Sequence, residues 1–212
     1  MSEGIKIAFD GPDGCGKTTQ LNIAAEWLSD ENQKAWSTRN MGGTMIGEAI
    51  RTVALDSDLP RTPETNLYIS MALGTELSHE MEEKTSKGSH VLVDRSPMSV
   101  IAYQIFGDQL TDQRLGYDSA EKLMKLMGFD LILIFSAAQK TLDQRRKGRT
   151  DKPSDYYEDQ LIDYHERVQE GYKKAVQWAT QRELAGHVAV IDAERTVEEI
   201  AADVRAEIEK LL

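Results

Sequence analysis

The residues best suited to chemistry form a glycine-rich stretch near the start of the chain, Gly11-Pro12-Asp13-Gly14-Cys15-Gly16-Lys17-Thr18. Two glycines with four residues between them, followed by Lys and then Thr, match the pattern of a phosphate-binding loop. Glycines let successive backbone N–H groups approach an anion closely, and the N-terminus of a following helix adds partial positive charge. We therefore expect Lys17 to reach the phosphates of a bound nucleotide and the Thr18 hydroxyl to bind Mg²⁺; a plain glycine-rich turn is the alternative.

A second pair of candidate residues, Asp94 and Arg95, follows the apolar segment Val91-Leu92-Val93, which predicts a buried strand. In phosphate-loop proteins, an acid at such a strand end helps to hold Mg²⁺, and an arginine presents a fork of donors to a phosphate. The alternative is a solvated ion pair. The phosphate loop upstream favours the functional interpretation.

A basic cluster occurs late in the chain although the formal net charge is −11. Most such clusters are solvated loops. In phosphoryl transfer, however, a closing loop can bring guanidinium groups to the developing negative charge and exclude water. We therefore expect an arginine-rich lid over about residues 144–155. The cluster consists of Arg145, Arg146, Lys147, Arg149 and Lys152.

The elements that must position these residues alternate along the chain. Hydrophobic periodicity predicts strands at 5–9, 33–38, 90–93, 130–135 and 187–191. Helices are expected at 18–28, from Thr44 onward, and at 64–87, 98–106, 119–127, 154–184 and 197–212, and the segment 139–152 is expected to be a helix that breaks into a basic loop. This alternation predicts one α/β domain over residues 1–212, with a five-stranded parallel sheet covered by helices on both faces. Ligands in such folds bind at the carboxyl ends of the strands, where the phosphate loop and Asp94 fall. The most apolar strand, 130–135, is expected near the centre of the sheet.

Length and composition limit the class of protein. The 212 residues, 40% of them hydrophobic and 29% charged, suffice for one domain with a full core. The net charge of −11 argues against nonspecific binding to nucleic acid, and no apolar run approaches the roughly 18 residues that would cross a membrane. The single cysteine, Cys15, allows neither a disulfide nor a cysteine zinc site. A cytoplasmic enzyme is the expectation.

Four blocks of the chain resemble the thymidylate kinase family, within the nucleoside monophosphate kinases. The phosphate loop with Thr19 and Gln20 is the first block, and Thr38-Arg39 with Gly42-Gly43-Thr44 and Arg51 is the second. The third and most specific is Asp94-Arg95-Ser96-Pro97-Met98-Ser99-Val100-Ile101-Ala102-Tyr103-Gln104, and the fourth runs from Tyr164 to Tyr172, followed by Val190-Ile191-Asp192-Ala193. The resemblance implies a three-layer P-loop kinase fold, phosphorylation of dTMP to dTDP with ATP and Mg²⁺, and a homodimer.

Carried over position by position, the resemblance implies roles for the site residues. The ATP phosphates would be bound by Gly11, Pro12, Asp13, Gly14, Cys15, Gly16, Lys17, Thr18, Thr19 and Arg146, and Mg²⁺ by Thr18 and Asp94. The acceptor would be bound by Asp13, Arg39, Arg51, Tyr68, Arg95, Ser99, Tyr103 and Gln104. Within that set, Asp13 would meet the 3′-hydroxyl, Arg51 and Arg95 would hold the phosphate, and Tyr103 would crowd the 2′ position.

The catalytic set implied by the resemblance is Lys17, Arg95, Arg145 and Arg149. Some family members carry an arginine inside the phosphate loop, at the position that Gly14 occupies here. The catalytic arginine is therefore expected to come from the lid.

The chain departs from the family where the base should be recognised. Family members usually have, along the helix expected at 64–87, an aromatic residue that stacks on thymine and, one turn later, an arginine that reads its O4. Here the candidates are Tyr68 followed by Ala72, or Met71 followed by Thr75, and no arginine lies between Arg61 and Arg95. Tyr68 is thus a stacking residue or a core aromatic, and Gln104, Glu76 and His79 are candidates for reading a base edge.

Three further departures are Ser96 in place of Tyr or Phe, Asn40-Met41 in place of Glu-Pro, and Val100 in place of Asn or Thr. Two alternatives to dTMP phosphorylation therefore stay open. One is the same transfer to a different (deoxy)nucleoside monophosphate. The other is a nucleotide-binding regulatory protein without acceptor turnover.

Overall fold

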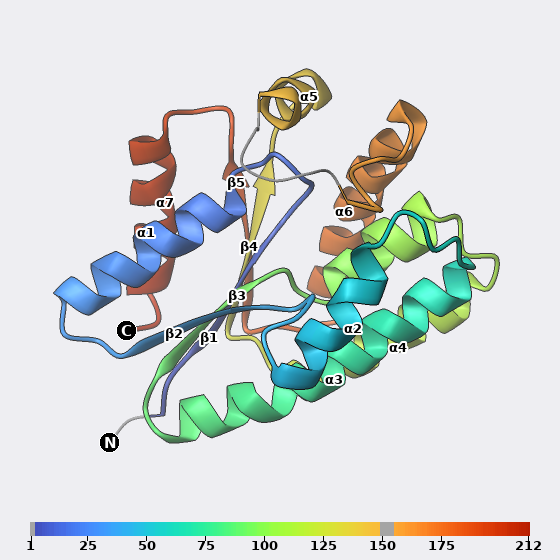
Figure 1. Ribbon diagram of the computed structural model, residues 1–212. Helices are drawn as coiled ribbons and strands as arrows, with labels where there is room; N and C mark the ends of the chain where they lie inside the picture. The colour runs from blue at the N-terminus through green and yellow to red at the C-terminus, as the bar shows by residue number, and fades with distance from the viewer. Residues whose placement is uncertain (1–2, 149–154) are drawn as a thin grey trace.

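A five-stranded, all-parallel sheet lies at the centre of the computed structural model, which describes residues 3–148 and 155–212 (Figure 1). The strand order is β2-β3-β1-β4-β5. The strands are β1 (Lys6–Asp10), β2 (Ala35–Arg39), β3 (His90–Asp94), β4 (Leu131–Ser136) and β5 (His187–Asp192). The predicted α/β fold with a parallel sheet is confirmed. The most apolar strand, β4, is interior but off-centre, and β1 is the central strand, so the loop that follows β1 leaves from the middle of the sheet.

Helices cover both faces of the sheet. The helical elements are α1 (Lys17–Asp30), α2 (Met45–Leu55), α3 (Pro63–Ser86), η1 (Val100–Gly107), α4 (Gln113–Met127), α5 (Gln139–Lys147), α6 (Ile162–Gln181) and α7 (Val197–Glu209). Helices α1 and α7 pack on one face, whereas α3, α4, α6 and η1 pack on the other (Figure 1). Helix α5 stands beyond the end of β4, which is the edge of the sheet where the loop after β1 begins.

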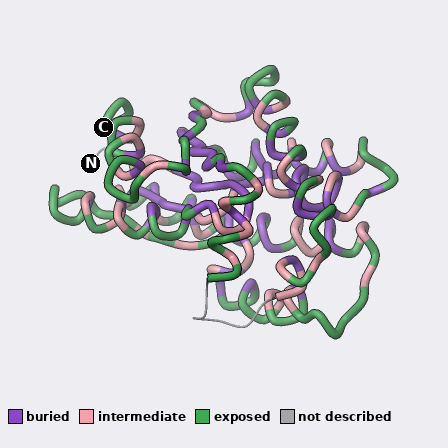
Figure 2. The backbone as a smooth tube through the Cα atoms, turned by 90° about the horizontal axis from the view of Figure 1, so that it is seen from above, coloured by how far each residue is buried: buried purple, intermediate pink, exposed green. Residues whose placement is uncertain are grey.

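Alternation along β1 explains how one strand serves both layers. Ile7 and Phe9 belong to the core beneath α1 and α7, whereas Ala8 belongs to the core beneath α3, α4 and η1. This is the period of two that a strand imposes on its side chains. Viewed from above, buried residues concentrate in the middle of the molecule and exposed ones on the outer turns of the helices (Figure 2).

Threonine caps begin three of the helices. The side chain of Thr44 accepts the N–H of Gly47 at the start of α2, as predicted, and Thr62 and Thr196 cap α3 and α7 in the same way. Pro63 occupies the first turn of α3, where no backbone donor is needed. These caps satisfy orphan backbone N–H groups and fix where each helix starts.

The long late helix begins later than the sequence predicts: α6 starts at Ile162 rather than near residue 154. The Asp155 carboxylate accepts the N–H groups of Tyr157 and Glu158, and the Tyr156 N–H donates to the carbonyl of Leu55. A side chain that satisfies nearby backbone donors competes with helix formation. Part of the predicted lid, residues 149–154 with Arg149 and Lys152, lies outside the described residues.

The helix expected at 98–106 is a π-helix, η1, and α6 lies directly against it. Close approach depends on Gly171, because a Cβ there would lie 2.7 Å from the Cα of Ala102. π-Helical turns are rare and often occur at functional sites. Here the π-helix carries Tyr103 and Gln104.

None of the helices within residues 3–148 and 155–212 combines the length and apolarity needed to cross a membrane.

Candidate active site

An open cavity of about 1030 Å³ lies where the phosphate loop, the end of β3, η1 and α5 meet. The predicted site residues in its lining are Asp13, Gly14, Gly16, Lys17, Thr18, Thr19, Arg39, Arg51, Asp94, Arg95, Ser99, Tyr103, Gln104, Arg145 and Arg146. Gly11, Pro12 and Cys15 are buried in the loop behind this lining. Tyr68 is not part of the lining, and Arg149 lies outside the described residues. The structure therefore brings most of the predicted set to one cavity.

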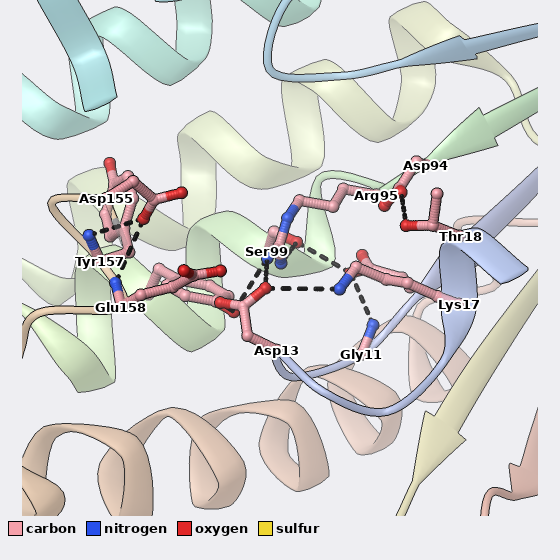
Figure 3. Close-up of polar contacts among 12 residues, drawn as sticks. Gly11, Asp13, Lys17, Thr18, Asp94, Arg95, Ser99, Asp155, Tyr157 and Glu158 are labelled. Carbon is pink, nitrogen blue, oxygen red and sulfur yellow. Dashed lines mark hydrogen bonds and ion pairs between the residues drawn. The ribbon is translucent and has the colours of Figure 1, made fainter. Parts of the chain in front are cut away.

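Lys17 opens α1 directly behind the phosphate loop and is 7% exposed. Its ammonium lies 3.5 Å from Oδ1 of Asp13 (Figure 3). Burial and the nearby Arg95 lower the pKa of Lys17, but the negative potential of Cys15, Asp13 and Asp94 outweighs them and raises its pKa above the usual value. Lys17 is therefore a cation at neutral pH, and it lies on the floor of the cavity.

Arg95 presents its guanidinium to the same carboxylate. One terminal nitrogen lies 2.5 Å from Oδ1 of Asp13 and donates to the Tyr103 hydroxyl at 3.1 Å, while the other donates to the hydroxyl of Tyr172 at 3.1 Å. Burial lowers the pKa of Arg95, yet Asp13, with smaller effects from Tyr103, Tyr172 and Asp10, raises it well above the ordinary value. The backbone of Arg95 is left-handed, with φ of 78°. A non-glycine residue held in this region stores strain, which is common at ligand sites.

Asp10, a residue to which the sequence analysis gave no role, organises the space behind Arg95. It is fully buried, and its carboxylate accepts the Gly11 N–H, the Ser96 N–H and hydroxyl, and the hydroxyls of Ser99 and Tyr172. These donors satisfy a buried charge that would otherwise be costly. Ser96, which departs from the family pattern, thus hydrogen-bonds to Asp10 and links the end of β3 to the start of the phosphate loop. The only sequence signal was the position of Asp10 next to the glycine loop.

Thr18 and Asp94 form the candidate metal site. The Thr18 hydroxyl donates to Oδ2 of Asp94 at 2.5 Å, so a hydroxyl oxygen and a carboxylate oxygen lie side by side at the mouth of the phosphate loop (Figure 3). Among the described residues, no group of three or more His, Cys, Asp or Glu side chains could enclose a metal ion. Mg²⁺ prefers oxygen ligands and usually takes only one or two from the protein, the rest coming from phosphates and water. The Thr18–Asp94 pair fits that requirement.

Arg39 and Arg51 stand on the opposite wall, where Glu48 orders Arg39 and the Met41 carbonyl orders Arg51. Arg39 donates to both carboxylate oxygens of Glu48, at 2.8 and 2.7 Å, and Arg51 donates to the carbonyl of Met41. The Gly43 N–H lowers the pKa of Glu48, and Arg39 lowers it further. Burial and the neighbouring Arg39 lower the pKa of Arg51, although it remains a cation. Two guanidinium groups therefore face the cavity from this wall.

The described lid arginines approach the phosphate loop from α5. Arg146 pairs with Asp143, and its Cγ lies 3.2 Å from the position that a Cβ on Gly14 would occupy. Gly14 also has φ of 88°, so a side chain at this position would be strained as well as crowded. Arg145 lines the cavity and makes no ion pair with any described residue. The space beside Gly14 is thus filled by a lid arginine.

The end of the cavity between α3 and η1 differs from the sequence expectation. Tyr68 is 59% exposed, so it neither lines the cavity nor belongs to the core. Glu76 and His79 are exposed and also lie outside the lining. Ser70 is the residue of α3 that lines the cavity, together with Val100 and Gln104 of η1. Periodicity alone did not indicate which side of α3 faces the cavity, because apolar and small residues occur on both sides.

Sequence comparisons agree with this arrangement. The family model described as thymidylate kinase matches residues 9–204. A relative from Desulforudis audaxviator, named thymidylate kinase, is 34% identical over 99% of this chain and 92% of its own length. Relatives of the same name from Gloeobacter violaceus and Chromobacterium violaceum are 30% and 28% identical over 97% and 100% of this chain, covering 95% and 97% of their own lengths. With the family model matching nearly the whole chain and the phosphate loop, Arg95 and the lid arginines gathered at one cavity, the chain belongs to the thymidylate kinase family.

Proposed function

We propose that this cavity performs the reaction of the family, the transfer of a phosphoryl group from ATP to dTMP, with the residues assigned below. The observation that carries the proposal is the contact between Asp13 of the phosphate loop and Arg95 at the end of β3. This contact joins the phosphate loop, which is suited to ATP phosphates, to the Arg95 guanidinium, which is suited to the acceptor phosphate.

The chemistry needs positioning rather than a general base. The acceptor phosphate is already an anion and a competent nucleophile, so the enzyme must hold two polyanions in line and offset their repulsion. Lys17 supplies positive charge on the ATP side, and Arg95 and Arg51 supply it on the acceptor side. Preorganised charges in a site that excludes water stabilise the transition state most strongly.

The sugar is recognised by Asp13 and Tyr103. The Tyr103 hydroxyl donates to Oδ2 of Asp13 at 2.8 Å, and its ring packs edge-on against Tyr157 and Tyr172. Asp13 accepts from the 3′-hydroxyl of the acceptor. The fixed ring of Tyr103 fills the space beside the 2′ carbon and favours a deoxyribose, and Ser99 supports the Arg95 fork at 3.5 Å.

Thr18 and Asp94, whose oxygens lie 2.5 Å apart, would hold Mg²⁺. The ion would supply positive charge that neutralises the transferring phosphate. Arg145 and Arg146 contribute guanidinium groups from the lid, and Arg39 adds a second cation beside Arg51 on the opposite wall. Arg149 is assigned to the lid on sequence alone.

A homodimer is also proposed, through α2 and α3. Their outward faces carry exposed apolar side chains: Met45 (91%), Ile46 (53%), Val53 (49%) and Tyr68 (59%). The two helices pack against each other. Apolar surface of this kind is typical of protein interfaces. Sedimentation of the wild type and of Met45→Glu tests the dimer, and a monomeric wild type would exclude it.

The reaction itself is tested by ADP release coupled to an optical assay, with ATP, Mg²⁺ and dTMP. We expect dTMP-dependent turnover that falls on the order of 10²-fold or more in Arg95→Ala. Arg114→Ala is the matched control, because the Arg114 side chain is 92% exposed and pairs with Asp118 on its own helix. Background rates for the folded wild type with dTMP would contradict the proposal.

A further inference from the structure

The side chain of Gln104 is a buried polar group for which the protein supplies no partner. Gln104 is 3% exposed, lines the cavity, and makes no side-chain hydrogen bond with any described residue. Its amide atoms are not among the fully sealed unpaired ones, so they keep contact with the cavity. An amide that faces a cavity and has no protein partner is free to hydrogen-bond a ligand bound there.

The part of the cavity lining that α3 and η1 contribute carries no charge. The cavity-lining residues from α3 and η1 are Ser70, Val100, Tyr103 and Gln104. One turn beyond Ser70 the residue is Gly74, where an added Cβ would lie 3.4 Å from Oδ1 of Asn40. The hydroxyl of Ser70 already donates to the carbonyl of Asn66 at 3.0 Å. Neither helix contributes a cation to the cavity lining. At the end of the cavity between α3 and η1, where we place the base, Gln104 is the polar side chain that remains available to it.

An amide recognises two opposite patterns equally well. Its oxygen accepts and its nitrogen donates, and rotation of the amide by about 180° exchanges the two positions. Thymine presents an acceptor at O4 and a donor at N3, whereas cytosine presents a donor at its 4-amino group and an acceptor at N3. A fixed cation could pair only with the 4-oxo group, but a glutamine can make two hydrogen bonds to either base.

We infer that the acceptor site takes pyrimidine deoxynucleoside monophosphates with either a 4-oxo or a 4-amino group, so that the enzyme phosphorylates dCMP as well as dTMP. This inference rests on the proposed function, because it concerns the acceptor subsite of the same cavity. The transferred group and the positions of Lys17, Arg95 and Arg51 are the same for both acceptors. Only the orientation of the Gln104 amide differs.

The test compares kcat/KM for dTMP, dCMP, dGMP and dAMP with saturating ATP and Mg²⁺. We expect the dCMP value to lie within about tenfold of the dTMP value, since a tenfold ratio corresponds to about 1.4 kcal/mol. A dCMP value more than about 100-fold below that of dTMP would overturn the inference and leave the proposed function intact. Turnover of dGMP and dAMP as fast as that of dCMP would also overturn it, because the site would then accept any base without recognition by the Gln104 amide. Background turnover with all four acceptors would instead overturn the proposed function.

Two variants separate recognition from folding. Gln104→Met keeps the volume and removes both hydrogen bonds, so kcat/KM should fall on the order of tenfold or more for dTMP and dCMP alike, with KM for ATP unchanged. Gln104→Glu presents only acceptors when ionised, and each base offers one donor and one acceptor, so kcat/KM should fall for dTMP and dCMP alike. Gln113→Met, at an exposed position of α4, is the matched control. Wild-type kcat/KM for both dTMP and dCMP in Gln104→Met, measured on folded protein, would show that Gln104 does not read the base.

Discussion

Arg95 and Asp13, 82 residues apart in the sequence, form an ion pair of 2.5 Å that closes the cavity between the phosphate loop and the end of β3. The Asp13 carboxylate also accepts from Tyr103 and lies 3.5 Å from the Lys17 ammonium. One carboxylate therefore orders a cation on the ATP side and a cation on the acceptor side. Lys17, Arg95 and Tyr103 differ in function, which makes their substitutions separable.

Replacement of Arg95 should impair the acceptor rather than ATP. Arg95→Ala removes the fork on the acceptor phosphate, so KM for dTMP should rise and kcat should fall, together on the order of 10²–10³-fold in kcat/KM. Arg95→Lys keeps the charge but loses bidentate geometry, and we expect an intermediate loss. Initial-rate kinetics with each substrate varied in turn measure both effects. An equal loss of ATP affinity would contradict the assignment of Arg95 to the acceptor.

Replacement of Lys17 should affect turnover more than folding. Because Lys17 is 7% exposed, alanine would open a gap in the core, whereas Lys17→Met keeps the volume and removes the charge. We expect kcat to fall on the order of 10²-fold or more, with thermal unfolding close to that of the wild type. Lys122→Met, on α4 and away from the cavity, is the control. A Lys17→Met enzyme with wild-type kcat would show that the phosphate loop does not work through this ammonium.

Asp108 should make the fold less stable as pH rises. Burial raises its pKa from 3.8 to about 6, although Asn66 donates to it at 2.8 Å. A carboxyl with a raised pKa favours the folded state when protonated, so its contribution is fully present below pH 3.8 and is lost as pH rises through about 6. The pKa difference corresponds to roughly 3 kcal/mol.

The measurement is the free energy of unfolding between pH 4 and pH 8 for the wild type and Asp108→Asn. The difference between them should change in favour of the asparagine variant as pH rises, since asparagine stays neutral and still accepts from Asn66. Asp118→Asn, at an exposed carboxylate, should show no such trend. Parallel pH profiles for the wild type and Asp108→Asn would mean that this carboxyl titrates normally in the fold.

The sequence predicted the elements and the phosphate side of the site because both depend on local patterns. Apolar alternation marks β1, and the glycine spacing with Lys17 marks the loop that follows it. The end of the cavity between α3 and η1 was not predictable in the same way. Which side of α3 faces the cavity depends on packing against η1, which puts Ser70 there and leaves Tyr68 outside.

Two further features depend on contacts between distant segments. Asp10 acquires its role only when Ser96 and Tyr172 meet it. The late start of α6 follows from the hydrogen bonds that Asp155 and Tyr156 make. Neither feature has a periodicity that a single sequence reveals.

The lid helix should depend on a residue from another loop. Ala138, at the N-terminus of α5, has no capping side chain, and Glu194 takes that place by accepting the Ala138 N–H at 2.5 Å and the Thr141 hydroxyl at 2.9 Å. Helix α5 carries Arg145 and Arg146 in its last turn. Loss of a cap costs about 1 kcal/mol. Glu194→Ala should therefore loosen the lid and lower kcat about fivefold, with KM for dTMP unchanged.

Graded variants test whether Glu194 acts through the cap. Glu194→Gln keeps one carbonyl oxygen as an acceptor and should retain most of the rate, whereas Thr141→Val removes only the hydroxyl partner and should give a partial loss. Glu198→Ala, at an exposed position in the first turn of α7, is the control for loss of a nearby negative charge. If Glu194→Ala and Glu198→Ala lower kcat equally, the effect is one of charge near the site rather than of lid position. If Glu194→Ala instead raises KM for dTMP at constant kcat, α5 does not carry the catalytic arginines.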